Sequence, residues 1–280
     1  MSAILVSIGF YAHLKEGVVI GGVYNRMTPK QKELAAYLQY DKHVALYKQR
    51  ECFLTPEQTY TDFSPQCKTI IKEDKTLLLW GDSHAAALSA GLRALFPSLI
   101  QYTTSACPPL MGLDFKLRPH CREINDFILR EIERVQPEIV MLHANWFVHL
   151  NKNLIPVMDK TVKRIIRVSP STKIYIVGNV PHWPSDLPIY MLKKGISFTK
   201  ERHLFTPMLR DLRKWYNKFQ LVCVNNKVNF FSPINYLCKG NMCQSAALLE
   251  GKLEPTAWDT AHLTEAGATL LAHKFSKQLE

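Results

Sequence analysis

Two short polar motifs, far apart in this 280-residue chain, carry the residue types that nucleophilic catalysis requires. Gly81–His84 (GDSH) contains Ser83, and Asp259-x-x-His262 supplies a histidine with a carboxylate three residues before it. A serine hydroxyl is a weak nucleophile and needs a base within hydrogen-bonding reach. The imidazole needs a partner that fixes its tautomer and stabilises its charged form. Each motif alone also fits a helix cap or a solvated turn, but the pair favours acyl transfer.

The residues around the serine motif predict the carboxyl edge of a parallel sheet. Leu77–Trp80 is a continuous apolar run, typical of a strand buried on both faces, and an Ala/Leu-rich helix follows over Ala85–Leu95. Ligands of open α/β sheets bind at this edge, and a helix N-terminus favours nearby negative charge. Ser83 is therefore expected to project into a cleft, with Gly81 giving the backbone freedom at the bend.

Strands and helices alternate along most of the chain, which predicts a three-layer α/β/α sandwich with a parallel sheet. We expect this domain to span residues 73–280, preceded by a helical and loop extension over residues 1–72. The other expected strands are Leu99–Thr103, Glu138–His143, Lys173–Val177 and Leu221–Val224, and the expected helices span 122–135, 153–168, 203–218 and Thr264 to the end.

The extension is expected to contain one polar-faced helix over Lys30–Arg50, with Thr28 and Pro29 as its start. No apolar stretch reaches the roughly 20 residues that span a bilayer, so no complete transmembrane helix is encoded. Ala3–Ala12 is apolar but short. It fits either an ordinary strand or short helix, or the tail end of a transmembrane helix, and the sequence leaves both open.

A side-chain amide follows another predicted strand, at Asn145. An amide at that sheet edge can donate to a developing oxyanion, although a turn residue or helix cap explains Asn145 equally well. The backbone N–H of Ser83 is a second natural donor. A third donor is expected from the loop Thr103–Cys107.

Together these motifs resemble the SGNH hydrolase pattern, with Gly81–Ser83 early, Asn145 in the middle and Asp259-x-x-His262 at the end. Three blocks resemble one branch of it, an SGNH domain fused behind a multi-spanning acyltransferase-3 membrane domain. This branch occurs in bacterial cell-surface glycan O-acetyltransferases, including O-antigen acetyltransferases. The blocks are WGDSHAAAL (Trp80–Leu88), SACPPL (Ser105–Leu110) and DxxHLTxxGA (Asp259–Ala268).

The resemblance implies an SGNH/flavodoxin-like fold and a role for each matching residue. Ser83 is expected to be the nucleophile, His262 the base and Asp259 its partner, with Ser83 and Asn145 in the oxyanion hole. The sequence departs from the family where the usual G-x-N-D block reads HANW over His143–Trp146. The separate oxyanion-hole glycine has no obvious counterpart, which puts the second and third donors in doubt.

The same resemblance implies partners and a location. A membrane acyltransferase-3 domain of the same polypeptide would pass acetyl groups from cytoplasmic acetyl-CoA to this domain, which itself binds no cofactor. The acceptor would be a sugar hydroxyl of a surface glycan, such as lipopolysaccharide O-antigen, at the periplasmic face of the inner membrane. Two alternatives remain, a carbohydrate O-acetylesterase with the same triad and a non-catalytic module that positions glycan.

Seven cysteines bear on the compartment. Sequence alone does not fix their pairing, but three local pairs each close a short loop, and Cys223 in the apolar run LVCV fits a free buried thiol. No C-x-x-C or clustered Cys/His spacing favours zinc, so no metal is expected. Three disulfides would indicate an oxidising compartment, whereas seven reduced thiols remain the alternative. The expected pairs are Cys52–Cys67, Cys107–Cys121 and Cys238–Cys243.

The composition is that of a folded soluble domain with a basic excess. Hydrophobic residues make up 47 %, and Lys and Arg outnumber Asp and Glu by 35 to 24, giving a formal net charge of +11. This favours anionic partners without choosing among them, and the absence of any nucleic-acid-binding motif argues against nucleic acid. His84 is expected to pack at the helix start. Trp146, Trp183 and Trp258 either stack on sugar rings at the sheet edge or pack into the protein.

Overall fold

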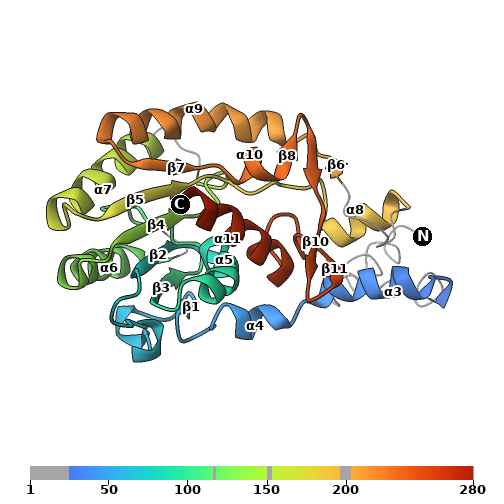
Figure 1. The fold of residues 1–280 in the computed structure, drawn as a ribbon, viewed down its shortest axis with the longest axis horizontal. Coiled ribbons are helices and arrows are strands. Elements are labelled where there is room, and N and C mark those ends of the chain that lie inside the picture. Colours follow the sequence, from blue (N-terminus) through green and yellow to red (C-terminus); the bar gives the residue numbers. More distant parts are fainter. Residues whose placement is uncertain (1–24, 116–117, 150–152, 196–202, 280) are drawn as a thin grey trace, which may run out of the picture.

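A six-stranded parallel sheet, in the order β1-β3-β2-β4-β5-β7, forms the centre of the part of the chain that the structure describes (Figure 1). The structure is a computed structural model and describes residues 25–279 apart from 116–117, 150–152 and 196–202. The segment Ala3–Ala12 lies outside these residues. The strands are β1 (Phe53–Leu54), β2 (Leu77–Gly81), β3 (Leu99–Thr104), β4 (Ile139–His143), β5 (Lys173–Val177) and β7 (Asn229–Phe231).

Helices cover both faces of this sheet, so the predicted α/β/α sandwich is confirmed. Leu77 and Leu79 of β2 pack into the hydrophobic cluster on one face, and Leu78 and Trp80 pack into the cluster on the other. This alternation follows from the period of two along a strand. Helices α5 (Ser83–Leu95) and α11 (Glu265–Leu279) cover the first face, and α6 (Cys121–Val135), α7 (Leu154–Val168) and α9 (Leu209–Asn226) cover the second.

One predicted strand is wrong, because Leu221–Val224 forms the last turns of α9. Leu221 and Val224 are 60 % and 67 % exposed, whereas Cys223 between them is buried. The short apolar run is too brief to distinguish a strand from a helix by its period. The strand at this position in the fold is β7, and helix α9 begins at Leu209 rather than residue 203 because His203–Phe205 forms the short strand β6.

The predicted single helix over Lys30–Arg50 is also wrong. Thr28 does cap its start, with the capping box that Gln31 completes, but the segment divides into α3 (Pro29–Ala35), the 3₁₀ helix η1 (Ala36–Gln39) and α4 (Lys42–Leu46). The backbone of Tyr40 is not helical, and the Tyr40 hydroxyl accepts a hydrogen bond from the Glu265 N–H at 2.9 Å. Docking onto the start of α11 therefore overrides local helix propensity.

The remaining short elements lie at the ends of the sheet and on its flanks. A three-stranded antiparallel sheet has the order β6-β9-β8, and β10 pairs with β11 as a hairpin. In Figure 1, this hairpin, α8 and α3 gather at one end of the molecule. Their bounds are α8 (Leu187–Lys193), α10 (Pro233–Leu237), η2 (Tyr60–Asp62), η3 (Pro65–Cys67), β8 (Cys238–Lys239), β9 (Met242–Gln244), β10 (Ala246–Leu249) and β11 (Lys252–Pro255). None of the helices within the described ranges is long and apolar enough to cross a bilayer.

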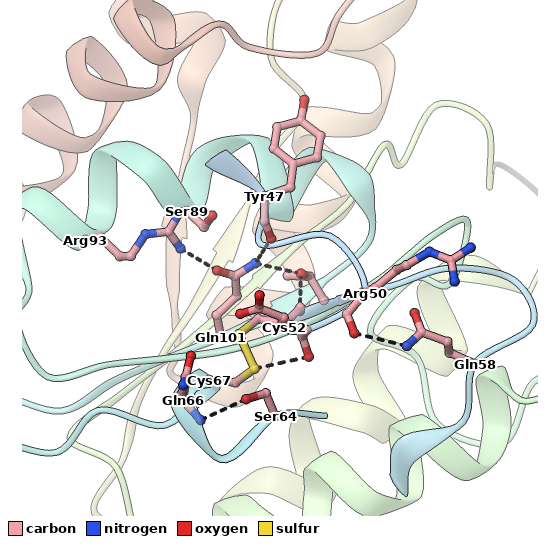
Figure 2. The surroundings of a disulfide bond; sticks show 12 residues. Tyr47, Arg50, Cys52, Gln58, Ser64, Gln66, Cys67, Ser89, Arg93 and Gln101 are labelled. Carbon is pink, nitrogen blue, oxygen red and sulfur yellow. Dashed lines mark hydrogen bonds between the residues drawn. A yellow bond between two sulfur atoms is a disulfide. The ribbon is translucent and has the colours of Figure 1, made fainter. Parts of the chain in front are cut away.

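Residues before the predicted boundary at 72 contribute to the main sheet. Strand β1 pairs with β3, and the predicted Cys52–Cys67 disulfide closes the loop that follows it. Figure 2 shows the neighbouring network, in which the Gln101 side chain of β3 donates to the Tyr47 carbonyl at 2.9 Å. The segment 45–72 is thus attached to the sheet by a strand and buried hydrogen bonds, and the disulfide closes a loop within the segment. The division of the chain into 1–72 and 73–280 stays a prediction.

All three predicted disulfide pairs are present in the structure, and Cys223 is free and buried, although in a helix. Burial raises the pKa of the Cys223 thiol to about 12, so this group stays protonated and behaves as a small hydrophobe. The Cys107–Cys121 bridge joins the loop after β3 to the start of α6. One bridge therefore holds the loop that leaves β3, and the Cys52–Cys67 bridge holds the loop after its neighbour β1.

Candidate active site

The tight turn from β2 into α5 places Ser83 at the carboxyl edge of the sheet. Gly81 ends β2 and pairs with His143 of β4, and a Cβ at Gly81 would lie 1.7 Å from the His143 carbonyl oxygen. The expected reason for this glycine was backbone freedom at the bend. The structure gives a different reason, because no side chain fits between the two strands here.

Asp82 is the N-cap of α5, as the structural interpretation of the motif expected, and it also joins two loops. Its Oδ1 accepts a hydrogen bond from the His84 N–H at 2.8 Å, and its Oδ2 accepts from the Asn145 N–H at 2.9 Å. His149 Nε2 lies 3.4 Å from the same Oδ2. Asp82 therefore fixes the β2–α5 turn against the loop after β4 and leaves Ser83 as the first residue of the helix.

The two sequence motifs meet in one hydrogen-bonded chain. Ser83 Oγ lies 2.8 Å from His262 Nε2, and His262 Nδ1 lies 2.6 Å from Asp259 Oδ2. The other carboxylate oxygen, Asp259 Oδ1, accepts from the backbone N–H groups of Ala261 and His262 at 2.8 and 2.6 Å. An imidazole protonated at Nδ1 satisfies both contacts, because it donates to the carboxylate and accepts from the serine hydroxyl.

The electrostatics of this group suit a general base. Burial lowers the pKa of His262, but the hydrogen bond and charge of Asp259 outweigh burial and hold that pKa above its usual value. Burial raises the pKa of Asp259, but His262 and the two backbone N–H groups outweigh it and bring that pKa below its usual value. Asp259 therefore stays ionised and stabilises the imidazolium that forms when His262 takes a proton.

Close packing of α5 against α11 fixes the distance between serine and histidine. A Cβ at Gly91 of α5 would lie 2.3 Å from the Ala268 carbonyl oxygen of α11, so the two helices approach more closely than side chains would permit. Figure 1 shows the two helices side by side on the same face of the sheet. Ser83 begins α5, and His262 lies in the loop just before α11. The contact between the two helices therefore fixes how far apart the two side chains lie.

The structure shows the surroundings of some of the predicted oxyanion donors, but it does not show that they bind an oxyanion. Asn145 follows β4 beside the nucleophile turn, and its side-chain Oδ1 is buried with no hydrogen-bond partner among the described residues. In the loop after β3, the N–H groups of Ser105 and Cys107 already donate, to the carbonyls of Leu54 and Thr104. These two amides are therefore committed elsewhere, and the roles of Asn145 and of the Ser83 N–H stay predictions.

Further histidines surround the imidazole of His262. The His84 ring centroid lies 4.3 Å from that of His262, which confirms that His84 packs at the helix start, and His182 stacks on His84. Burial lowers the pKa of His143 and of His182 to about 4 and the pKa of His84 well below its usual value, so these side chains are neutral near pH 7. In the described part of the chain, no group of three or more His, Cys, Asp or Glu is arranged to hold a metal ion.

The three tryptophans near the sheet edge differ in their surroundings. Trp146 and Trp183 are buried, so they belong to the packed interior rather than to a sugar-stacking surface. Trp258 is partly buried, stacks on His262 with ring centroids 5.5 Å apart, and donates from Nε1 to the Tyr47 hydroxyl at 3.1 Å. Trp258 is thus the tryptophan that contacts the candidate base.

Residues from the N-terminal segment, which the sequence did not connect to the site, complete its surroundings. Tyr40 and His43 both stack on Trp258, with ring centroids 6.3 and 5.3 Å away. The only signal in the sequence is the spacing of aromatic residues at Tyr37, Tyr40 and Tyr47, which also fits an ordinary helix face. Long-range docking of this segment was therefore not predictable from the motif.

A protein-family model matches most of the chain. The family model described as "SGNH domain (fused to AT3 domains)" matches residues 45–277. The chain belongs to this SGNH family. The match begins ahead of β1, so it includes the edge strand together with the rest of the main sheet. No match was found among curated proteins.

The fold of this SGNH domain is shared by a solved structure. The chain is similar to the lipopolysaccharide acetyltransferase periplasmic domain of Salmonella ser. Paratyphi A, with 24 % identity, 89 % of this chain and 99 % of that chain covered, and a TM-score of 0.72. It is less similar to an aryl esterase of M. smegmatis in its inhibitor-bound form, with 14 % identity, 73 % and 98 % coverage, and a TM-score of 0.46. The first of these shows that the two chains share an SGNH fold.

Proposed function

We propose that this SGNH domain transfers an acetyl group to a sugar hydroxyl of a surface glycan, such as lipopolysaccharide O-antigen. The observation that carries the proposal is the hydrogen-bonded chain from Ser83 Oγ through His262 to Asp259, at 2.8 and 2.6 Å. The family's fusion to acyltransferase-3 domains and the shared fold with a lipopolysaccharide acetyltransferase domain support acetyl transfer to glycan.

In the first half of the reaction, Ser83 becomes acetylated. His262 Nε2 takes the hydroxyl proton as Ser83 Oγ attacks the carbonyl carbon of the acetyl donor. The backbone N–H of Ser83 and the side chain of Asn145 stabilise the oxyanion of the tetrahedral intermediate. The intermediate collapses with cleavage of the bond to the leaving group, which takes the proton from His262, and the acetyl group remains on Ser83.

In the second half, a sugar hydroxyl takes the acetyl group. His262 removes the proton of that hydroxyl, whose oxygen attacks the acetyl carbon, and Ser83 Oγ leaves and regains the proton from His262. Asp259 stabilises the imidazolium at both stages. Water in place of the sugar would complete hydrolysis with the same groups, so acceptor binding distinguishes a transferase from an esterase.

The acetyl donor reaches this domain from a membrane partner in our proposal. A membrane acyltransferase-3 domain passes acetyl groups from cytoplasmic acetyl-CoA, and residues 1–72 provide the connecting segment and extension. Three disulfides support a site on the periplasmic side of the inner membrane, because such bonds persist in oxidising compartments.

Acetylation of the surface polysaccharide in cells tests this function. Cells carrying Ser83→Ala or His262→Ala in the full-length protein should lose the acetyl signals that NMR detects on the purified polysaccharide. His273→Ala, at an exposed histidine of α11, should keep them. Full acetylation in both triad variants would instead indicate a non-catalytic positioning module. Release of acetate from acetylated polysaccharide, without transfer to added acceptor, would indicate an esterase.

A further inference from the structure

A pocket of about 320 Å³ lies between the N-terminal helices and the β10–β11 hairpin. This volume is at the lower end of the range of small-molecule sites, roughly 300–1,000 Å³. Both aromatic and carboxylate side chains line it, and we call it the flanking pocket. Its main residues are Glu33, Tyr37, Tyr40, Asp41, Lys252 and Glu254.

A ladder of near-parallel rings connects the flanking pocket to the catalytic imidazole. Tyr37 stacks on Tyr40 at 5.9 Å, Tyr40 on Trp258 at 6.3 Å, and Trp258 on His262 at 5.5 Å. The angles between successive ring planes are 17°, 20° and 18°. Tyr40 lines the pocket, and two ring contacts separate it from the base that serves Ser83. A molecule in the pocket therefore lies too far from Ser83 for its own atoms to react but near enough to belong to a longer ligand.

Glu254 presents an unused acceptor within this pocket. The residue is 6 % exposed, and its Oε2 has no hydrogen-bond partner among the described residues. Burial, and after it the charge of the nearby Glu254 carboxylate, hold the pKa of the Tyr37 hydroxyl well above its usual value, so Tyr37 keeps its proton. A buried carboxylate oxygen without a donor is costly, and a ligand hydroxyl would remove that cost.

The charges around the pocket favour a neutral ligand rich in hydroxyl groups. Three carboxylates line it, those of Glu33, Asp41 and Glu254, against the two ammonium groups of Lys42 and Lys252. Lys252 is already paired with Glu33 at 2.7 Å. Although the whole chain carries +11, this pocket would repel a phosphate or uronate group and accept hydrogen bonds from hydroxyls.

We propose that the flanking pocket binds a neutral sugar residue of the acceptor glycan, at a distance along the glycan from the sugar that Ser83 acetylates. The C–H face of the sugar ring packs against Tyr37 and Tyr40, because the electron-rich faces of the aromatic rings attract polarised C–H groups. A sugar hydroxyl donates to Glu254 Oε2. This inference rests on the proposed function, and it assigns the acceptor a length of several sugar residues.

Binding of oligosaccharides to the purified chain tests the pocket directly. The probes are oligosaccharides released by mild acid from the surface polysaccharide of cells that carry Ser83→Ala, with affinity measured by calorimetry. Glu254→Gln and Tyr37→Ala should each weaken binding about tenfold. Tyr37→Phe retains the ring and should weaken it less. Glu250→Gln makes the same chemical change as Glu254→Gln at an exposed residue of the same hairpin and should bind as the wild type does.

The outcomes separate this proposal from the proposed function. Wild-type affinity in both Glu254→Gln and Tyr37→Ala, with thermal unfolding midpoints that show folded protein, would overturn the sugar site even if Ser83→Ala abolishes acetylation. Failure of the wild type to bind the oligosaccharides would also overturn it. Conversely, pocket-dependent binding together with full acetylation in Ser83→Ala cells would support the site and contradict the catalytic role of Ser83.

Discussion

The catalytic edge and the flanking pocket are built in different ways. The catalytic edge, meaning Ser83, Asp259, His262 and their supporting turns, lies at the ends of regular strands and at the starts of α5 and α11. The flanking pocket lies between a broken helical segment and a hairpin, neither of which belongs to the central sheet. Chemistry is thus positioned by the sheet, whereas the proposed recognition site depends on peripheral segments.

This difference predicts which changes affect reaction and which affect binding. Substitutions at the catalytic edge should act on the rate of acetyl-ester turnover, since the reacting atoms contact Ser83, His262 and Asn145 in our proposal. Substitutions that loosen the N-terminal segment should act mainly on glycan affinity. Four variants probe this separation, in decreasing order of expected effect.

Loss of the base should give the largest change. His262→Ala removes the group that accepts the Ser83 proton, so turnover of p-nitrophenyl acetate should fall roughly 10³-fold or more. The release of p-nitrophenol at neutral pH measures this rate. His273→Ala, at the exposed histidine of α11, is the matched control and should retain the wild-type rate. Equal rates in His262→Ala and wild type would contradict the role of His262 as the base that activates Ser83.

The partner of the base should set its pH dependence. In Asp259→Asn the main cause that raises the pKa of His262 is lost, which leaves burial as the largest effect, and burial lowers that pKa. The neutral base then persists to lower pH, so the rising limb of the rate profile should move to lower pH while the maximal rate falls about 10³-fold or more. Profiles of kcat/KM against pH, with Asp211→Asn as an exposed control, measure both effects. An unmoved limb would contradict the assigned role of Asp259.

The backbone of the catalytic edge should tolerate no added atoms. In Gly81→Ala the new methyl group would overlap the His143 carbonyl, where the space is 1.7 Å. The free energy of unfolding in urea should fall by at least about 3 kcal/mol. At Gly112 a Cβ meets nothing within 4 Å but φ is +78°, so Gly112→Ala should cost only about 1 kcal/mol. Similar losses for both would show that strand contact is not what requires Gly81.

The bridge in the N-terminal segment should affect binding more than reaction. Replacing both Cys52 and Cys67 by serine opens a loop of 15 residues and should lower the free energy of unfolding by about 2–3 kcal/mol. We expect weaker oligosaccharide binding with a smaller change in p-nitrophenyl acetate turnover. Cys223→Ala changes a thiol without opening a bridge and serves as the control. A larger loss of turnover than of affinity would contradict the separation of the two regions.

Most of the sheet and the triad geometry could be predicted from local patterns. The strand Leu77–Trp80 and the helix after it are marked by an apolar run followed by a polar turn, and Lys173–Val177 was predicted with the bounds that the structure shows. Ser83 begins α5, and Asp259 and His262 lie in the loop before α11, so a correct topology brings them to one edge. These features depend on near neighbours in the sequence.

The features that were not predicted depend on distant contacts. Leu221–Val224 is helical because α9 continues past it, and the helix expected over Lys30–Arg50 is broken where Tyr40 docks onto Glu265. The flanking pocket needs both Tyr37 and Glu254, which are separated by most of the chain. No periodicity or motif within either segment indicates such a contact. The flanking pocket therefore could not be predicted from the sequence.

Direct detection of acetyl-Ser83 is the measurement that tests the central claim. The purified chain is incubated briefly with p-nitrophenyl acetate, stopped with acid and digested, and the peptides are analysed by mass spectrometry. We predict one added acetyl group on Ser83, absent from Ser83→Ala and depleted when acceptor oligosaccharide is added before the acid. Acetate release at the wild-type rate by Ser83→Ala, or stable acetylation of another residue instead, would contradict the account.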